Sequence, residues 1–377
     1  MSLAPAAAFG LIWAGFAVYV GVLVWAPRLG HRFVWATIVV LLVVFACLPP
    51  LLSHDVYSYV DYARLGALHG LDPYVHPPAA FPADPAFAEV EWIDATSAYG
   101  PLFTLATYPL AKLPVDAAVY ILKAASAAAV LVIAILVARL APARGVDPLR
   151  AAAFVALNPL VLVHVVGGPH NDALAVLLMT LGVAGILTAR EAGAGAALIA
   201  AIAIKASAAV TLPFAVIASF RPTGRYVKYA LTYRPVGRML AGAGAAAGAL
   251  GVAACMAFGS DWLGVFTLAG ESQGRTSYMS IPIATARLTG LDPDTVRIAA
   301  LTLYAALVAY LLIWTYRGGD WLRAAAWATT GLLLATAWLL PWYLLWPLPL
   351  AALSRDRILQ ALLLGLTAYQ LGARIPL

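Results

Sequence analysis

The chain has 377 residues, of which 63% are hydrophobic and 11% are charged, and its formal net charge is +6. A soluble domain cannot bury so large an apolar share, so the composition indicates an integral membrane protein. The basic residues are spread over short connections. This pattern excludes a nucleic-acid-binding domain and suits the orientation of membrane spans.

Apolar runs of about 20 residues recur along the sequence, and each is about long enough to cross a bilayer as a helix. They predict a single all-α, polytopic membrane domain over residues 1–377 with about 10–12 transmembrane helices. The predicted spans are 8–26, 33–52, 117–138, 151–167, 172–189, 237–258, 296–315, 321–340, 342–353 and 358–373. Two more apolar segments, 99–113 and 192–219, are interrupted by proline or lysine and are predicted to break or re-enter the membrane.

Charge predicts which side of the membrane each connection faces. The basic connections are expected in the cytoplasm, at 28–32, 139–150, 221–238 and in the later connections that carry Arg317, Arg323, Arg355 and Arg357. Residues 53–98 carry seven acids against one basic residue, Arg64, and are expected outside. Two apolar segments, 99–113 and 117–138, lie between this outer connection and the basic connection 139–150. The polar motif at 167–172 shares the outer face if one of these two segments re-enters the membrane. It moves to the cytoplasm if both cross.

The stretch "SHDVYSYVDYARLGALHG" predicts a helix from Ser53 that Gly70 ends. Its apolar stripe consists of Val56, Val60, Ala63 and Ala67, and Asp61 is expected to pair with Arg64 on another face. We expect an amphipathic helix in the membrane interface, its stripe toward lipid and its tyrosines, Tyr57, Tyr59 and Tyr62, at headgroup depth.

Asp55 falls in the first turn of this helix, where the helix dipole favours an ionised carboxylate. Two interpretations stand side by side: a simple helix cap, or a functional acid at the mouth of a membrane span. The second gains support from the adjacent His54 and from the "DPY" turn that follows at Asp72.

Polar side chains also gather in "VHVVGGPHND", which supplies His164, His170, Asn171 and Asp172 at a junction between spans. A turn with an Asx cap would explain them, and so would a functional site. A zinc site is disfavoured because the two histidines are six residues apart and no third ligand is evident.

Two cations are candidates for binding an anion. Lys205 is the single charged residue between Glu191 and Arg221, and it either extends to the interface or faces an anion inside the helix bundle. Arg275, in a polar connection, either binds a phosphate or is simply solvated. The aromatic residues of "LLPWYLLWPLP", among them Trp342 and Trp346, are interpreted first as an interfacial belt.

Five segments in order resemble the polyprenyl-phosphate-mannose-dependent mannosyltransferases of actinobacterial envelopes. They are "SHDVYSYVDYARLGALHGLDPY", "YGPL", "GGPHNDAL", "IKASAAVTLP" and "PWYLLWPLP". That group, which includes α-1,6-mannosyltransferases, is similar to family 87 glycosyltransferases and shares the GT-C membrane fold. The resemblance implies a multi-pass protein of the bacterial inner (plasma) membrane. It also implies a lipid-linked sugar donor, a glycan or glycolipid acceptor, and an active site on the outer side.

The resemblance also assigns roles to residues. Asp55 would deprotonate the acceptor hydroxyl, which attacks the anomeric carbon with inversion. Lys205, His170 and Arg275, in that order, would face the polyprenyl phosphate. Further donor-binding candidates are Asn171, Asp172, His54 and Tyr99. No cofactor is demanded, and Asp61 would be the extra acid if a divalent metal bound.

Two other classes compete with this interpretation. A secondary transporter or lipid flippase would explain the isolated Lys205 and the broken helices, but the sequence shows no internal repeat. A scaffold subunit without activity would leave the one-sided cluster of polar residues unexplained.

Overall fold

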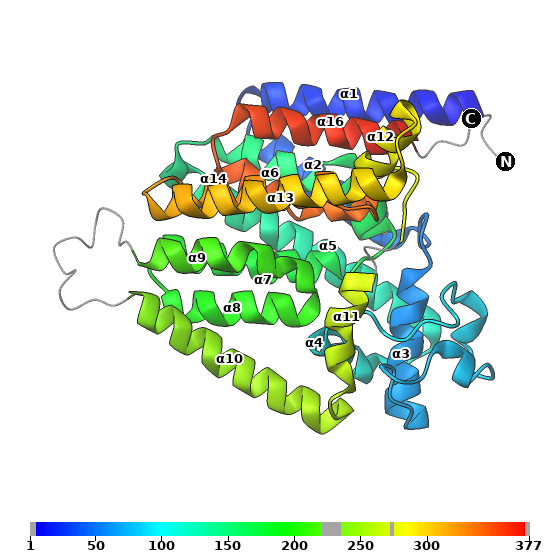
Figure 1. Ribbon diagram of the computed structural model, residues 1–377. Helices are drawn as coiled ribbons and strands as arrows, with labels where there is room; N and C mark the ends of the chain where they lie inside the picture. The colour runs from blue at the N-terminus through cyan, green and yellow to red at the C-terminus, as the bar shows by residue number, and fades with distance from the viewer. Residues whose placement is uncertain (1–4, 221–234, 272–274, 374–377) are drawn as a thin grey trace. The chain divides into compact units, whose positions relative to one another are not determined.

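The computed structural model describes residues 5–220, 235–271 and 275–373 (Figure 1). These residues form helices and connections, and no strand occurs among them, which confirms the all-α prediction. The chain divides into two compact units, each assembled from separate segments. Unit 1 comprises Met1–Phe45, Val130–Val163 and Gly274–Leu377, and unit 2 comprises Ala46–Ala129 and His164–Gln273. Most of the basic connection 221–238 lies outside the described residues.

Unit 1 contains the two ends of the chain and a middle segment. Its helices are α1 (Pro5–Leu29), most of α2 (His31–Cys47), the second half of α5 (Val115–Leu140), α6 (Pro148–Ala156), α12 (Ile281–Thr289), α13 (Pro293–Tyr316), α14 (Trp321–Ala335), α15 (Leu348–Leu353) and α16 (Arg357–Ala373). Helices α14 and α15 belong to its core: most side chains of α14 and all of those of α15 are buried. Trp342 and Trp346 are also buried, so the predicted interfacial belt is wrong at these positions.

Unit 2 contains all the segments around the predicted catalytic acid. Its helices are α3 (Asp55–His69), α4 (Pro101–Thr107), the first half of α5, α7 (Asp172–Leu187), α8 (Glu191–Ile204), α9 (Leu212–Ser219), α10 (Pro235–Phe258) and α11 (Gly264–Glu271). Helices α7, α8 and α10 lie side by side, with α8 in contact with both of the others (green in Figure 1).

Four described helices are long and apolar enough to cross a membrane: residues 10–29 of α1, then α5, α10 and α13. A fifth span results if α6 and the π-helical segment Val161–Gly167, which are bent by 60° relative to each other, are counted together. A multi-pass membrane protein is therefore confirmed. The larger predicted number of crossings remains a prediction, because the other apolar helices have 17 residues or fewer.

Two predicted spans are not continuous helices. Helix α14 ends at Ala335, and the backbone is extended at Thr336, so the predicted span 321–340 is too long. The predicted span 342–353 consists of a short 3-10 turn, Pro341–Leu345, followed by α15. Prolines explain the second departure, because Pro341, Pro347 and Pro349 each lack a backbone donor and disfavour helix at the residue before them.

The predicted break in 192–219 is confirmed at Lys205. Helix α8 ends at Ile204, whose carbonyl accepts a hydrogen bond of 3.0 Å from the backbone N–H of Gly100. A Cβ atom at Gly100 would lie 2.1 Å from the carbonyl oxygen of Ala203, so only glycine allows this approach. Lys205 then adopts an extended conformation, with φ −149° and ψ 120°, which presents its side chain outside the helix.

Candidate active site

Helix α3 begins and ends close to the predicted positions. Its first residue is Asp55, whose backbone N–H lies 3.2 Å from the Ser53 hydroxyl oxygen. Gly70 ends it in the left-handed conformation, with φ +66°, and donates its N–H to the carbonyl of Leu65. The acid therefore sits in the first helical turn, where unpaired backbone N–H groups stabilise a carboxylate.

The surroundings of α3 differ from the prediction. Val56 and Val60 pack with Phe103 of α4 and Val119 of α5, so the apolar stripe faces protein rather than lipid. Tyr59 and Tyr62 are also buried, which is incompatible with headgroup depth. The physical reason is that α4 and α5 supply an apolar surface with matching shape, which lipid tails cannot offer.

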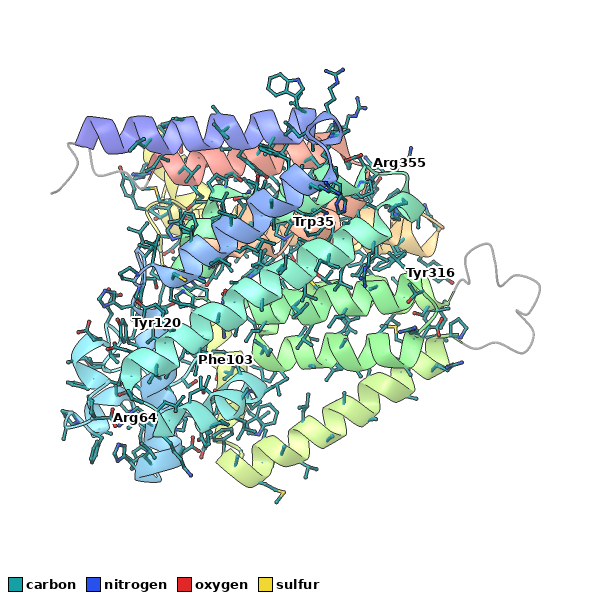
Figure 2. All side chains as sticks on the ribbon, turned by 180° about the vertical axis from the view of Figure 1, so that it is seen from behind. Trp35, Arg64, Phe103, Tyr120, Tyr316 and Arg355 are labelled. Atoms are coloured by element: carbon teal, nitrogen blue, oxygen red, sulfur yellow. The ribbon has the colours of Figure 1, made fainter. Side chains whose placement is uncertain are left out.

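The predicted Asp61–Arg64 pair does not form. The Arg64 guanidinium, labelled in Figure 2, instead lies 2.8 Å from an Asp84 carboxylate oxygen and also donates to the Ala111 carbonyl. Asp61 is fully buried, and neither of its oxygens has a hydrogen-bond partner among the described residues. Burial first, and the charge of Asp84 second, raise the pKa of Asp61 to about 7.

Asp55 lies among polar partners that come from distant parts of unit 2. The indole N–H of Trp92 donates to Oδ1 over 3.3 Å, and Nε2 of His170 lies 3.4 Å from Oδ2. Burial raises the pKa of Asp55, but the hydrogen bonds and charges of its neighbours, above all His170, outweigh burial and lower it overall. The predicted ionised state is thus supported, and 17% of the side chain stays accessible.

The contact of His170 with the His164 carbonyl shows which ring nitrogen carries a proton. Its Nδ1 lies 2.7 Å from the carbonyl oxygen of His164, and a carbonyl can only accept, so Nδ1 carries a proton. A ring with that single proton would turn the bare Nε2 lone pair toward the Asp55 carboxylate. The arrangement is favourable when Nε2 is protonated as well, which places an imidazolium beside the carboxylate.

Lys205 pairs with a buried acid. Its ammonium lies 2.6 Å from Oδ2 of Asp172, whose side chain is fully buried, while 20% of the lysine side chain is accessible. The positive charge of Lys205 also lowers the pKa of Asp55. The sequence indicated a cation here but did not predict that Asp172 would hold it.

Three other predicted residues lie in the same unit. Asn171 is buried, and neither end of its side-chain amide has a hydrogen-bond partner among the described residues. Tyr99 packs edge-on against Tyr59, with ring centres 4.7 Å apart. His54 is exposed, and its Nδ1 lies 3.2 Å from the Glu89 carbonyl oxygen. Arg275 belongs to unit 1 and is exposed, so its predicted role rests on the sequence alone.

Two residues of the site were missed by the sequence interpretation. Trp92 gave little signal in an irregular connection. Lys123 gave a clear one, because it is the single charged residue between Asp116 and Arg139. Its fully buried ammonium donates to the carbonyls of Val166 and Gly167, and the backbone N–H of Leu51 also donates to Gly167. Lys123 therefore ties α5 to the turn that precedes His170, and Leu51 ties the segment that leads into α3 to the same turn.

No group of three or more His, Cys, Asp or Glu side chains arranged to hold a metal ion occurs among residues 5–220, 235–271 and 275–373. The role of Asp61 as an extra acid for a bound divalent metal stays a prediction.

Comparison with known proteins identifies the chain's relatives. A family model described as alpha-(1->6)-mannopyranosyltransferase, N-terminal domain, matches residues 2–221. The chain belongs to this family. Membership in the alpha-(1->6)-mannopyranosyltransferase family confirms the resemblance seen in the sequence and the expected enzyme class, a glycosyltransferase.

Family members from three bacteria illustrate the similarity. Alpha-(1->6)-mannopyranosyltransferase A of Mycobacterium tuberculosis is 31% identical over 360 residues, which cover 89% of this chain and 68% of that protein. Its counterpart in Corynebacterium glutamicum is 34% identical over 173 residues, covering 44% and 35%. A probable alpha-(1->6)-mannopyranosyltransferase of Mycolicibacterium smegmatis is 29% identical over 355 residues, covering 81% and 62%. No solved structure matches the chain.

Proposed function

We propose that this protein transfers mannose from a polyprenyl-phosphate-linked donor to a glycan or glycolipid acceptor, with Asp55 as the general base. Family membership supports mannose as the sugar, since the relatives are named mannopyranosyltransferases. The observation that carries the assignment of the base is the position of Asp55, ionised and accessible between Trp92 and His170. No other described acid of unit 2 combines these contacts with the charge of a nearby lysine.

In this reaction the acceptor hydroxyl oxygen attacks the anomeric carbon of the donor. The bond from that carbon to the phosphate oxygen breaks, and its electron pair leaves with polyprenyl phosphate. The hydroxyl proton passes to the Asp55 carboxylate. A single displacement inverts the anomeric carbon, so an α product requires a β-linked donor.

The developing charge on the phosphate needs a cation. Lys205 is the candidate within unit 2, since it is partly accessible and Asp172 fixes its position. An ammonium that lies near both Asp172 and Asp55 can neutralise a phosphate without losing its buried partner. The unpartnered amide of Asn171 is suited to a sugar hydroxyl, because a buried amide without hydrogen bonds is costly.

We place this site on the outer side of the bacterial inner membrane. The acid-rich connection 53–98 supports that orientation, since basic connections stay in the cytoplasm. Labelling an Asp94→Cys variant in a background without Cys47 and Cys255 tests it. A membrane-impermeant maleimide applied to intact cells should modify the new cysteine. Labelling only after lysis would place the connection inside.

The transporter alternative was based on the isolated Lys205 and on the broken helices. The structure removes the first of these reasons, because the Lys205 ammonium lies 2.6 Å from Asp172. A buried ion pair stabilises a fixed site and does not by itself indicate a transport pathway.

The decisive experiment measures transfer from polyprenyl-phosphate [14C]mannose to a short mannoside by the protein in lipid nanodiscs. Asp55→Asn should lower the rate by about 100-fold or more, the usual contribution of a general base. Asp61→Asn is the matched control: it makes the same change from carboxyl to amide in the same helix, away from the site, and should transfer mannose at the wild-type rate. Full activity of folded Asp55→Asn would refute the mechanism.

A further inference from the structure

We propose that the indole face of Trp92 is the binding platform for the acceptor sugar, a neutral glycan ring whose hydroxyl is held against Asp55. This inference rests on the proposed function and adds the acceptor subsite to it. The starting observation is that Trp92 combines a hydrogen bond to Asp55 with a partly exposed side chain. Its N–H donates to Asp55, whereas 39% of the residue is exposed.

The connection around Trp92 is held in place. The carbonyl of Ile93 accepts from the N–H of Ala79 at 2.8 Å, and the carbonyl of Ala95 accepts from the hydroxyl of Tyr62 at 2.7 Å. Tyr62 belongs to α3, the helix that begins at Asp55. The segment that carries the tryptophan is thus fixed relative to the catalytic acid, and little ordering would be required when a ligand binds.

The chemistry of the surface favours a neutral sugar. An aromatic ring offers an apolar face that suits the C–H face of a pyranose, while the polar groups beside it suit the hydroxyl groups. Residues 78–98 contain four acids and no lysine, arginine or histidine. Three of these acids, Glu89, Glu91 and Asp94, are exposed, so they repel anionic lipid headgroups and can accept hydrogen bonds from hydroxyls. This disfavours the other common use of an exposed tryptophan, anchoring in the membrane interface.

A sugar bound on Trp92 would also lie beside the proposed base. A ring stacked on Trp92 lies next to the carboxylate that the same indole contacts, so a hydroxyl at its rim reaches Asp55. His54 precedes Asp55 directly in the chain: its ring lies 5.6 Å from that of Tyr57, and its Nδ1 is engaged by the Glu89 carbonyl. Because a carbonyl only accepts, the His54 Nδ1 carries a proton, which leaves Nε2 as an acceptor for a sugar hydroxyl in the neutral ring.

The test compares three variants in nanodiscs: Trp92→Leu, Trp92→Phe and Ile93→Ala. Leucine removes the aromatic face, phenylalanine keeps it, and Ile93 is a neighbour of similar exposure at 38%. With a mannoside acceptor titrated at saturating donor, Trp92→Leu should raise the acceptor KM about tenfold. Trp92→Phe should raise it less than about threefold, and Ile93→Ala should leave it unchanged. The donor KM should be that of the wild type in all three.

Three results would overturn the platform: a wild-type acceptor KM in Trp92→Leu, an equal effect of that variant on the donor, or an effect that follows lipid composition, as a membrane anchor would show. Saturation-transfer NMR of the mannoside alone, without donor, separates this from a failure of the proposed function. If the wild type binds the mannoside and Trp92→Leu does not, the platform stands even when polyprenyl-phosphate mannose is not the donor.

Discussion

Nε2 of His170 lies 3.4 Å from Oδ2 of Asp55, while its Nδ1 donates to the His164 carbonyl over 2.7 Å. The contact to Asp55 is longer than an ordinary hydrogen bond, but it joins two buried or half-buried groups of opposite charge when the ring is protonated. The backbone of one turn thus orients the ring that favours the ionised form of the Asp55 carboxylate.

Replacing His170 by glutamine should change the pH dependence of the reaction. The pKa of Asp55 is lowered in the native protein, with burial opposing and His170 the leading favourable contribution, so its removal raises that pKa. The acid limb of kcat/KM should therefore move to higher pH, and activity at pH 5 should fall more than activity at pH 8. A uniform loss at all pH values would show a purely structural role for His170.

The Lys205–Asp172 pair predicts a non-additive pair of variants. Lys205→Met leaves the fully buried Asp172 carboxylate without its counter-charge, and we expect a loss of about 3–5 kcal/mol in the free energy of unfolding. Adding Asp172→Asn should restore most of that stability, measured by thermal unfolding in detergent. If Lys205 is the cation for the phosphate, as proposed, the double variant should still transfer no mannose. Recovery of activity along with stability would assign the lysine to the fold alone.

Asp61 predicts a stability that falls as the pH rises. Its pKa is raised to about 7 in the folded protein, chiefly by burial, with Asp84 adding to the shift and Arg64 and His69 opposing it. The pKa of this acid is higher in the folded protein than in the unfolded chain, where it is about 3.9. Its contribution to the free energy of unfolding is therefore complete below the unfolded pKa and is lost as the pH rises to the folded pKa. The slope is about 1.4 kcal/mol per pH unit at most. Asp61→Asn should flatten the dependence between pH 4.5 and 7, and an unchanged slope would contradict the assignment.

Gly100 predicts a large effect from one methyl group. A Cβ at this position would lie 2.1 Å from the backbone oxygen of Ala203, which cannot move without distorting the end of α8. Gly100→Ala should therefore displace Lys205 and lower both transfer activity and melting temperature. Gly193→Ala, within α8, is the control, since nothing lies within 4 Å of the position that its Cβ would take. It should stabilise the protein slightly, as alanine does in a helix.

The helical class and the start of α3 could be predicted because hydrophobicity and helix signals are local. The partners of α3 could not. The stripe of Val56 and Val60 is equally compatible with lipid and with protein, and only the fold brings Phe103 and Val119 to it. Arg64 likewise had Asp61 three residues away, yet it binds Asp84, which lies 20 positions distant. Sequence separation shows which charged residues can pair within one helix. It does not show whether a residue from another segment forms the ion pair instead.

In the candidate site, too, single residues could be predicted from the sequence and their contacts could not. Asp55, His170 and Lys205 were each recognisable because a membrane protein rarely keeps polar groups near its spans without use. Their contacts were not recognisable, since Asp55 and His170 lie 115 positions apart in the sequence. Trp92 shows the limit clearly: an indole in an irregular connection has no periodic signal, and its role depends wholly on which carboxylate its N–H reaches.

The buried ammonium of Lys123 has a consequence for how the protein is made. When α5 enters the bilayer during synthesis, the carbonyls of Val166 and Gly167 that this lysine will bind follow it in the chain and have not yet reached the membrane. Insertion of α5 must therefore bear up to about 3 kcal/mol for an unpaired charge, until roughly 40 more residues emerge. We expect nascent chains truncated before Gly167 to retain α5 in the membrane less well than the same chains carrying Lys123→Leu, and chains extended beyond it to show no difference. Equal retention at both lengths would contradict this order of assembly.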